Sequence, residues 1–478
     1  MKRLLLIALI LLSSAVSAQK NYTIKIKIPQ LKGEECLLSY HFGDKKYIKD
    51  TAKFSMSGIC TFKGKINDSL KGGIYLVVFP TLGNRYIEFL VNEKETLIEF
   101  ESDTMDLNKN LKVIVSDENK AFQADIDFLD TKRRAIDNLS QAYTAPKTTE
   151  KEKKEIQANM SKIESDIKAN RINFIQDNPN MFWSKILNLM REIDVPEVPR
   201  KPNGEMVDSN FQYRYYKEHY WDYTDFNDDR ILRTPIFENK FKTYFDKLVI
   251  KNSDTINAEC DYILAKIKNK KSDMWNYCLV TMLNEYANSN VMGLDAVYVH
   301  LVEKYYSKGL APWVDSATLQ KMNVNALELK PLLIGKVASN VVGFDTALVK
   351  SWQLYDIKTD YIVLYFWNPD CGHCKKTTPE LNELYAEIKK RNCEVFSVTT
   401  ANYEELQMWK EFTREHKLKF LNLGDPYFKH LPSFRQIYNI KSTPQVYILD
   451  KYYRIIAKRL GVDQIIDFLD NYKKMKNN

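Results

Sequence analysis

The first part of the chain alternates apolar and polar residues, which is the pattern of half-buried β-strands. Tyr22, Ile24, Ile26 and Ile28 are apolar at every second position, so their side chains would lie on one face of a strand. Further short apolar runs, separated by Gly- and Asn-containing turns, span residues 37–40, 59–62, 74–79, 86–91 and 97–100. We therefore predict an antiparallel β-sandwich domain over residues 19–105.

After residue 105 the apolar residues recur at the spacing of a helix. The segments 122–143 and 156–167 each carry such a stripe, and Ala145-Pro146 separates them. This arrangement predicts an antiparallel helical hairpin whose stripes pack within their own domain rather than against a partner. Helical patterns continue further along the chain, so we predict an all-α domain over residues 106–310.

The last part of the chain alternates strand-like and helix-like segments. An apolar run over residues 361–367 precedes a helical pattern, and similar runs then alternate almost to the end. This order predicts an α/β fold over residues 336–478, joined to the helical domain by a linker over residues 311–335. The expected architecture is therefore multidomain: a β-sandwich, then an all-α helical domain, then an α/β domain.

Length and charge limit the possible functions. A chain of 478 residues is too long for one hydrophobic core. The formal net charge of +8 is small for this length, and Lys and Glu are interspersed throughout. No concentrated basic surface is expected, so we predict no nucleic-acid partner.

The N-terminal residues have the pattern of a secretory signal peptide. Lys2 and Arg3 precede an apolar run that ends at Leu12, and small residues follow up to Ala18. We predict a signal peptide over residues 1–18, with cleavage after Ala18, and no transmembrane anchor in the mature chain. The expected location is the periplasm.

Seven cysteines are spread along the chain, and two of them are separated by only two residues. Cys371 and Cys374 are spaced so that their sulfurs meet across one helical turn and can form a small disulfide. Cys36 and Cys60 fall in neighbouring predicted strands, and whether they pair stays open. The remaining cysteines are interpreted as buried thiols.

The segment Cys371-Gly372-His373-Cys374 follows a predicted strand and begins a predicted helix. The positive end of the helix dipole would stabilise a thiolate on Cys371, so we predict Cys371 as the nucleophile. Cys374, one turn further on and more shielded, would be the resolving thiol. The expected redox group is the Cys371–Cys374 disulfide itself, with no other cofactor.

These residues resemble the thioredoxin superfamily, in particular its secreted TlpA/ResA-type branch. The resemblance is carried by the motif from Phe366 to Lys376 with Trp367, by Pro379 in the following helix, and by Thr443-Pro444 before a predicted strand. It implies a thioredoxin-like fold for residues 336–478, thiol-disulfide oxidoreductase activity, protein thiol or disulfide clients and a membrane-linked electron donor. The two upstream regions look like domains of unknown function that precede such thioredoxin domains.

Gly372, His373, Trp367 and Pro379 are expected to tune the site or shape its loop. Thr443 and Pro444 are expected to bind clients. A partly protonated His373 would favour the Cys371 thiolate and make the redox couple more oxidising. In thioredoxin-like folds Thr443 precedes a cis Pro444, and its backbone can pair with an extended peptide.

The chain departs from the family at two positions. Thioredoxins have a buried aspartate where this chain has Tyr365, and cytochrome-maturation reductases have a glutamate where it has Thr377. The group that deprotonates Cys374 is therefore open, with Glu380 and Lys375 as nearby alternatives.

Other chemistries fit the sequence less well. Asn368-Pro369-Asp370 lacks the threonine that a peroxidase requires, Lys375 stands where haem attachment requires a histidine, and zinc would lack a fourth ligand. His219 lies near several aspartates within residues 213–233, but their spacing favours helix-capping turns over a metal site. We predict no metal site.

The sequence thus predicts a periplasmic thiol-disulfide oxidoreductase that exchanges electrons with protein disulfides, in the reductive direction. One alternative from another class stays open. The chain could be an envelope binding or assembly protein whose thioredoxin-like domain recognises clients with little turnover.

Overall fold

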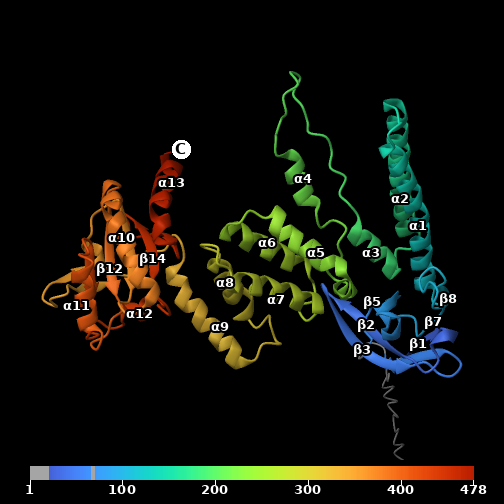
Figure 1. Cartoon of the computed structure of the whole chain (residues 1–478), viewed down its shortest axis with the longest axis horizontal. Coiled ribbons are helices and arrows are strands. Elements are labelled where there is room, and N and C mark those ends of the chain that lie inside the picture. The colour runs from blue at the N-terminus through green and yellow to red at the C-terminus, as the bar shows by residue number, and fades with distance from the viewer. Residues whose placement is uncertain (1–20, 66–69, 478) are drawn as a thin grey trace, which may run out of the picture. The chain divides into compact units, whose positions relative to one another are not determined.

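The computed structural model of the chain describes residues 21–65 and 70–477 (Figure 1). The predicted signal peptide and its cleavage site after Ala18 lie outside the described residues. The chain forms two compact units. The first comprises the residues up to Leu248 together with the short segment Ser272–Met274. The second comprises Val249–Lys271 and the residues from Trp275 onward. In the described part of the chain, no helix has the length and hydropathy needed to span a bilayer.

The first unit begins with the predicted β-sandwich. Its two four-stranded sheets have the strand orders β4-β1-β7-β8 and β3-β2-β5-β6. Alternate residues of β1, from Tyr22 to Ile26, are buried, which confirms the strand that the apolar alternation predicts. The strands of these sheets are β1 Asn21–Lys27, β2 Glu35–Phe42, β3 Lys45–Lys53, β4 Ile59–Lys65, β5 Gly73–Phe79, β6 Arg85–Val91, β7 Leu97–Glu101 and β8 Lys112–Val115.

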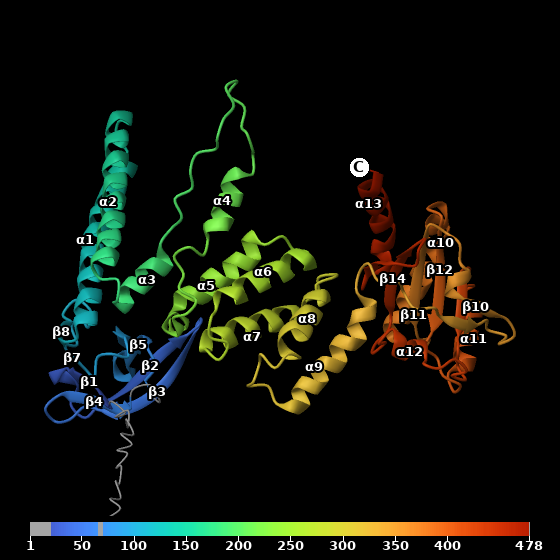
Figure 2. The same cartoon turned by 180° about the vertical axis from the view of Figure 1, so that it is seen from behind.

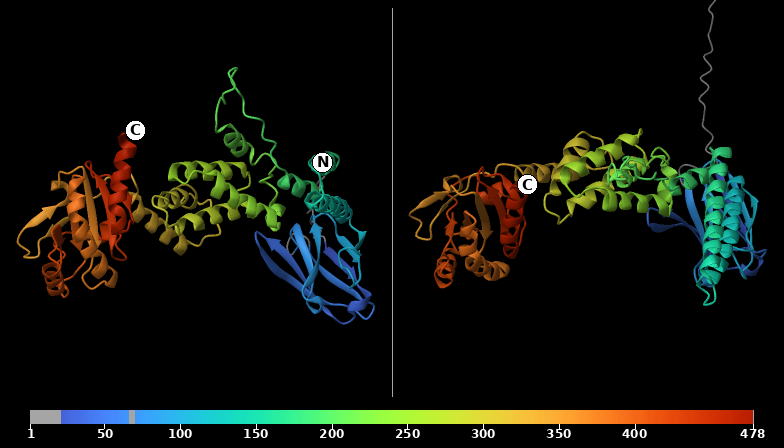
Figure 3. Two further views of the ribbon diagram at one scale, coloured as in Figure 1. Left: turned by 45° about the horizontal axis from the view of Figure 1, so that its top comes forward. Right: turned by 90° about the horizontal axis from the view of Figure 1, so that it is seen from above.

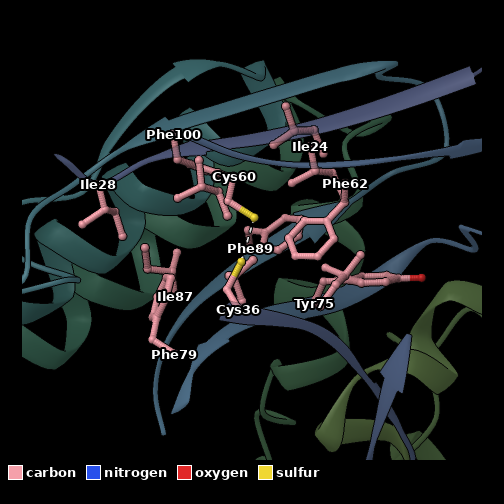
Figure 4. Packing of buried hydrophobic residues seen from close by; sticks show 14 of the residues in the cluster. Ile24, Ile28, Cys36, Cys60, Phe62, Tyr75, Phe79, Ile87, Phe89 and Phe100 are labelled. Carbon is pink, nitrogen blue, oxygen red and sulfur yellow. Dashed lines mark hydrogen bonds between the residues drawn. The ribbon is translucent and has the colours of Figure 1, made fainter. Parts of the chain in front are cut away.

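The inner faces of the two sheets meet in a core of aromatic and aliphatic side chains (Figure 4). Cys36 on β2 and Cys60 on β4 point toward each other from opposite sheets, with 2.7 Å between their sulfurs. Phe89 and Phe100 also meet across the two sheets, edge to face, with ring centroids 5.4 Å apart. The sandwich is therefore closed by side chains from both sheets.

The β-domain extends beyond residue 105, where the sequence predicts its end. Strand β8 pairs antiparallel with β7 and forms the edge of its sheet. The four residues of β8 are exposed or half-buried, so the strand is too short and too exposed to give a clear periodic signal. The helical part begins at Ser116, whose hydroxyl oxygen accepts the backbone N–H of Asn119 at 3.0 Å and so caps the first helix.

The predicted helical hairpin is present as α1 Asp117–Thr144 and α2 Glu150–Asp177 (Figures 1 and 2). Thr149 and Glu152 form a reciprocal capping box at the start of α2. The two helices lie side by side in every view (Figure 3). None of the residues of α2 is fully buried, so the apolar stripes pack between the two helices without forming a closed core.

Three further helices complete the first unit, and they lie around a group of aromatic side chains. Trp221, which follows one of these helices, contacts Phe226 and Tyr244 with ring centroids 5.1 Å away in both cases. This packing explains the concentration of aromatic residues in this stretch of the sequence. The helices are α3 Phe182–Met190, α4 Phe211–His219 and α5 Pro235–Thr243.

The second unit begins with helices and includes a helix in the segment predicted as a linker. Asp315 caps this helix by accepting the backbone N–H of Thr318 at 2.9 Å, and Pro331 follows its last turn. Pro312 and Pro331, whose presence favours a linker over residues 311–335, therefore flank a helix. The helices are α6 Ser253–Lys266, α7 Asp273–Ala287, α8 Asp295–Leu301 and α9 Ser316–Leu329. The first two residues of α7 belong to the first unit.

The chain ends in the predicted α/β domain, which is built on a seven-stranded mixed sheet with the order β10-β9-β13-β12-β11-β14-β15. Strands β11, β12 and β13 are parallel, whereas β14 runs antiparallel to β11. The strands are β9 Val342–Phe344, β10 Ser351–Gln353, β11 Tyr361–Trp367, β12 Cys393–Thr399, β13 Leu421–Gly424, β14 Gln445–Asp450 and β15 Ile455–Lys458. The helices are α10 Gly372–Lys390, α11 Leu406–Glu415, α12 Phe434–Ile437 and α13 Ile465–Asn477.

The central strand β11 is buried on both faces. Val363, Tyr365 and Trp367 belong to the core on one face, and Ile362, Leu364 and Phe366 belong to the core on the other. A strand covered on both sides has a continuous apolar sequence, which is the run from which it was predicted. The strand leads directly to the cysteine pair, so the site stands on the most buried part of the domain.

Candidate active site

The Cys371-Gly372-His373-Cys374 segment lies where β11 gives way to α10. Cys371 is the N-cap residue of α10, and Gly372 is the first residue of that helix. The backbone N–H of Cys371 donates to the carbonyl oxygen of Asn368 at 3.2 Å, which closes the turn between strand and helix. Because the first N–H groups of a helix have no acceptors within it, the sulfur of Cys371 lies beside unpaired donors.

The Cys371 thiol is partly exposed, and its pKa is lower than the ordinary value of 9.0. Partial burial alone would raise the pKa, but hydrogen bonds from the backbone N–H of Cys374 and from the side chains of Thr443 and Cys374 outweigh burial. His373 lowers this pKa through its backbone N–H. The electrostatic effect expected of its imidazole stays a prediction.

The Cys374 thiol is fully buried, one helical turn beyond Cys371. Burial raises the pKa of this thiol to about 11, and hydrogen bonds from the backbone of Asn368 and from Thr443 oppose the shift only in part. At neutral pH the thiolate is therefore concentrated on Cys371. Since the thiolate is the attacking form, the dithiol has one exposed nucleophile and one shielded partner.

Asn368 is a contributor that the sequence analysis missed. Its backbone contacts both members of the cysteine pair: the carbonyl oxygen accepts from Cys371, and the N–H lowers the pKa of Cys374. Its side-chain amide lies 3.3 Å from a carboxylate oxygen of Glu405, which holds the turn. The only sequence signal for this role is the position of Asn368 between the strand and the first cysteine.

A group of hydroxyls lies at Tyr365 and Thr377, the two positions at which the sequence departs from the family that it resembles, and at the neighbouring Thr378. The Tyr365 hydroxyl lies 3.1 Å from that of Thr377 and 2.9 Å from that of Thr378, and all three side chains are buried. Burial raises the pKa of Tyr365, and Cys374 is among the groups that raise it further. This neutral group cannot accept a proton from Cys374 as a carboxylate would.

The two alternative proton acceptors named from the sequence are not equivalent in the structure. Lys375 is exposed and lies 3.4 Å from a carboxylate oxygen of Asp370, so its ammonium group is directed to the surface. Glu380 is half-buried on α10, six residues beyond Cys374. Neither residue is among the groups that shift the pKa of Cys374.

The structure also places the other residues of the predicted motif. Trp367 is fully buried, and its ring centroid is 5.1 Å from that of Phe412. Pro379 lies inside α10. A Cβ atom at Gly372 would meet no heavy atom within 4 Å, so no close neighbour requires glycine there. His373 is exposed.

The Thr443-Pro444 segment lies against the cysteine pair, although it is far away in the sequence. The peptide bond between the two residues is cis, and β14 begins at the next residue. The Cys371 thiol donates to the backbone carbonyl oxygen of Thr443 at 3.3 Å. The structure therefore brings together Cys371, Cys374 and Thr443 and leaves the backbone of Thr443 at the mouth of the site.

The acidic cluster near His219 has capping and pairing roles. His219 Nδ1 lies 2.6 Å from a carboxylate oxygen of Asp222, and Asp228 accepts the backbone N–H of Arg230 at 3.1 Å. Asp225 pairs with Lys185 at 3.0 Å. In residues 21–65 and 70–477, no group of three or more His, Cys, Asp or Glu side chains is arranged to hold a metal ion.

Comparison with protein families gives two matches along the chain. Residues 145–329 match a domain of unknown function, DUF5106. Residues 334–458, which include the cysteine pair and the Thr443-Pro444 loop, match the AhpC/TSA family.

The individual relatives each match a part of this chain rather than its whole length. The thiol-disulfide oxidoreductase ResA of Bacillus cereus is 30% identical over 139 residues, which is 29% of this chain and 76% of that protein. The solved domain of a possible thiol-disulfide isomerase from Cytophaga hutchinsonii is 36% identical and covers 31% of this chain and 99% of its own, with a TM-score of 0.28. A thioredoxin-like protein from Bacteroides caccae is 21% identical and covers 59% of this chain and 99% of its own, with a TM-score of 0.43.

Proposed function

Because this chain belongs to the TlpA/ResA-type family of thiol-disulfide oxidoreductases, we propose that Cys371 and Cys374 exchange electrons with protein disulfides in the periplasm, in the reductive direction. One observation carries this proposal. A partly exposed thiol with a lowered pKa stands at a helix N-terminus, next to a buried thiol with a raised pKa. This asymmetry suits a nucleophile followed by a resolving group.

The reaction proceeds in two displacements. The Cys371 thiolate attacks one sulfur of a client disulfide, and the other client sulfur leaves as a thiolate and takes up a proton. Cys374 then loses its proton and attacks the Cys371 sulfur of the mixed disulfide, which releases the second client thiol. The client gains two electrons, and the pair is left as the Cys371–Cys374 disulfide.

Each turnover then requires a dithiol donor that returns two electrons to the pair. We assign this role to a membrane-linked thiol donor, because the proposed location is outside the cytoplasm, where soluble thiols are scarce. The signal-peptide pattern of residues 1–18 supports the location. The redox state of the pair in cells, measured by thiol trapping, tests the direction: a mostly reduced pair supports reduction of clients, and a fully oxidised pair contradicts it.

The activity is tested by reduction of insulin with dithiothreitol as electron donor. Cys371→Ser should reduce the rate to the uncatalysed background, and Cys374→Ser should accumulate a mixed disulfide with insulin. Cys393→Ser is the matched control, because Cys393 is a buried thiol of the same domain with no part in the reaction. If the wild type and both active-site variants react at the same slow rate, the chain is a binding protein rather than an enzyme.

A further inference from the structure

A groove of about 750 Å³ opens beside the active site within the second unit. One wall contains His373, which lies between the two cysteines, and the Thr443-Pro444 loop. The other wall comes from the helical part that matches the domain of unknown function and contains Asn290, Asp295 and Asn325. A groove of this size exceeds what a disulfide bond alone would occupy.

The helical wall is fixed to the thioredoxin-like sheet by a buried ion pair. Lys458, at the end of β15, pairs with Asp295, the first residue of α8, and also donates to the carbonyl oxygen of Leu332 at 2.7 Å. The side chains of Lys458 and Asp295 are only 5% and 9% exposed. Because an unpaired buried charge is costly, the two elements are held together and the groove keeps its shape.

One atom in this groove lacks a partner. Lys458 contacts Oδ2 of Asp295, while Oδ1 of the same carboxylate is buried and has no hydrogen-bond partner among the described residues. A buried acceptor without a donor is unfavourable. Asp295 is one of the residues that line the groove, so a small turn of its side chain toward the groove would offer Oδ1 as an acceptor to a ligand N–H group.

Three amide side chains in the lining of the groove suit a polypeptide. Asn290, Asn325 and Gln445 carry side-chain amides, which both donate and accept hydrogen bonds as a peptide backbone does. Gln445 directly follows the Thr443-Pro444 loop and begins β14, so an extended segment that passes this loop would continue between the two walls.

We propose that the helical part of the second unit forms one wall of the client-binding groove, which holds an extended polypeptide segment next to the client's disulfide. Oδ1 of Asp295 accepts an N–H from this segment. The inference rests on the proposed function, and it gives the region of unknown function a role in selecting polypeptide disulfides over small ones.

The test compares a polypeptide with a small disulfide. Asn290→Trp and Asn325→Trp would fill the groove, and Asn284→Trp on α7 is the matched control because Asn284 is exposed and does not line this groove. Each protein is assayed for reduction of insulin and of dithiobis(nitrobenzoate). The groove variants should lower kcat/KM for insulin by about tenfold or more and change the small-disulfide rate by less than about twofold. The control should match the wild type with both substrates.

A binding measurement separates this inference from the proposed function. Fluorescently labelled, carboxymethylated insulin B chain has no disulfide, so its binding, measured by anisotropy, requires the groove but no redox chemistry. Binding that weakens in both groove variants supports the groove even if no variant reduces insulin, in which case only the proposed function fails. If peptide binding and insulin reduction are unchanged in the groove variants, the proposed client groove is wrong. It is also wrong if the groove variants lose the same fraction of kcat/KM with both disulfide substrates.

Discussion

The Tyr365 hydroxyl lies 2.9 Å from the Thr378 hydroxyl, at the position where thioredoxins carry a buried aspartate. We expect Tyr365→Phe to destabilise the protein by about 1–3 kcal/mol, because buried hydroxyls would lose their partner. The reduction rate should change by less than about threefold, since a phenol with a raised pKa does not serve as the base. Urea denaturation and insulin reduction measure the two effects. Tyr361→Phe, on the same strand, is the control, and a large loss of rate in Tyr365→Phe alone would show that the hydroxyl takes part in proton transfer.

Cys371 should be the first cysteine to react with iodoacetamide in the reduced native protein. Its pKa is lowered, whereas burial raises those of Cys374 and Cys393 to about 11 and about 12. The alkylation rate should be proportional to the thiolate fraction of Cys371. It should therefore fall as the pH decreases through the pKa of this thiol, which lies below 9.0. Mass spectrometry of peptides after timed quenching identifies the site. Rapid labelling of Cys393 at pH 7 would contradict the order of reactivity.

The resolving step should become faster as the pH rises. Burial is the main cause that raises the pKa of Cys374, and it persists in the mixed disulfide. The thiolate fraction of Cys374, which is the attacking form, should therefore increase between pH 7 and 10. Rapid-quench measurement of the decay of the mixed disulfide tests this expectation. A rate independent of pH over this range would mean that another group removes the proton before attack.

The buried pair of Lys458 and Asp295 should be sensitive to the loss of one partner. Lys458→Met is expected to cost about 3–5 kcal/mol in the free energy of unfolding, because it leaves a buried carboxylate without its cation. Combining it with Asp295→Leu should restore most of this loss. Urea denaturation measures both variants, with exposed Lys451→Met as the control. If the double variant is as unstable as the single one, the pair is not what limits stability here.

Cys36 and Cys60 should form a disulfide in protein isolated from an oxidising compartment. Their sulfurs are 2.7 Å apart in the sandwich core, and an oxidising protein disulfide would accept the two electrons as both protons leave. Peptide mapping without reduction should recover the linked peptides, while Cys260 and Cys393 stay as thiols. Complete alkylation of Cys36 and Cys60 after unfolding without a reductant would contradict the prediction.

The elements predicted most accurately from the sequence are those whose structure depends on one local pattern. The apolar run of β11 and the spacing of Cys371 and Cys374 predicted the strand, the turn and the helix, because each depends on adjacent residues. Strand β8 and helix α9 were missed for opposite reasons. The first has only four residues, and the prolines around the second resemble those of a linker.

The groove was not predictable from the sequence in the same way. Asp295 and Lys458 are separated by 163 positions, and neither lies in a motif. Their pairing depends on how the helical part packs on β15, which no local periodicity reports. The cluster of three hydroxyls at Tyr365, Thr377 and Thr378 was also not predicted. The sequence indicated only that the carboxylates of the resembled family are absent.

The open space around Gly372 has a consequence for how this scaffold can diversify. Since a side chain there would meet no neighbour within 4 Å, and His373 is exposed, the two residues between the thiols can be exchanged without repacking the domain. Each unit of change in the pKa of Cys371 corresponds to about 30 mV in a two-electron couple. Variation at these two positions thus shifts the balance between electron donor and electron acceptor while the fold and the thiol chemistry stay the same, and at His373 it also changes one wall of the groove.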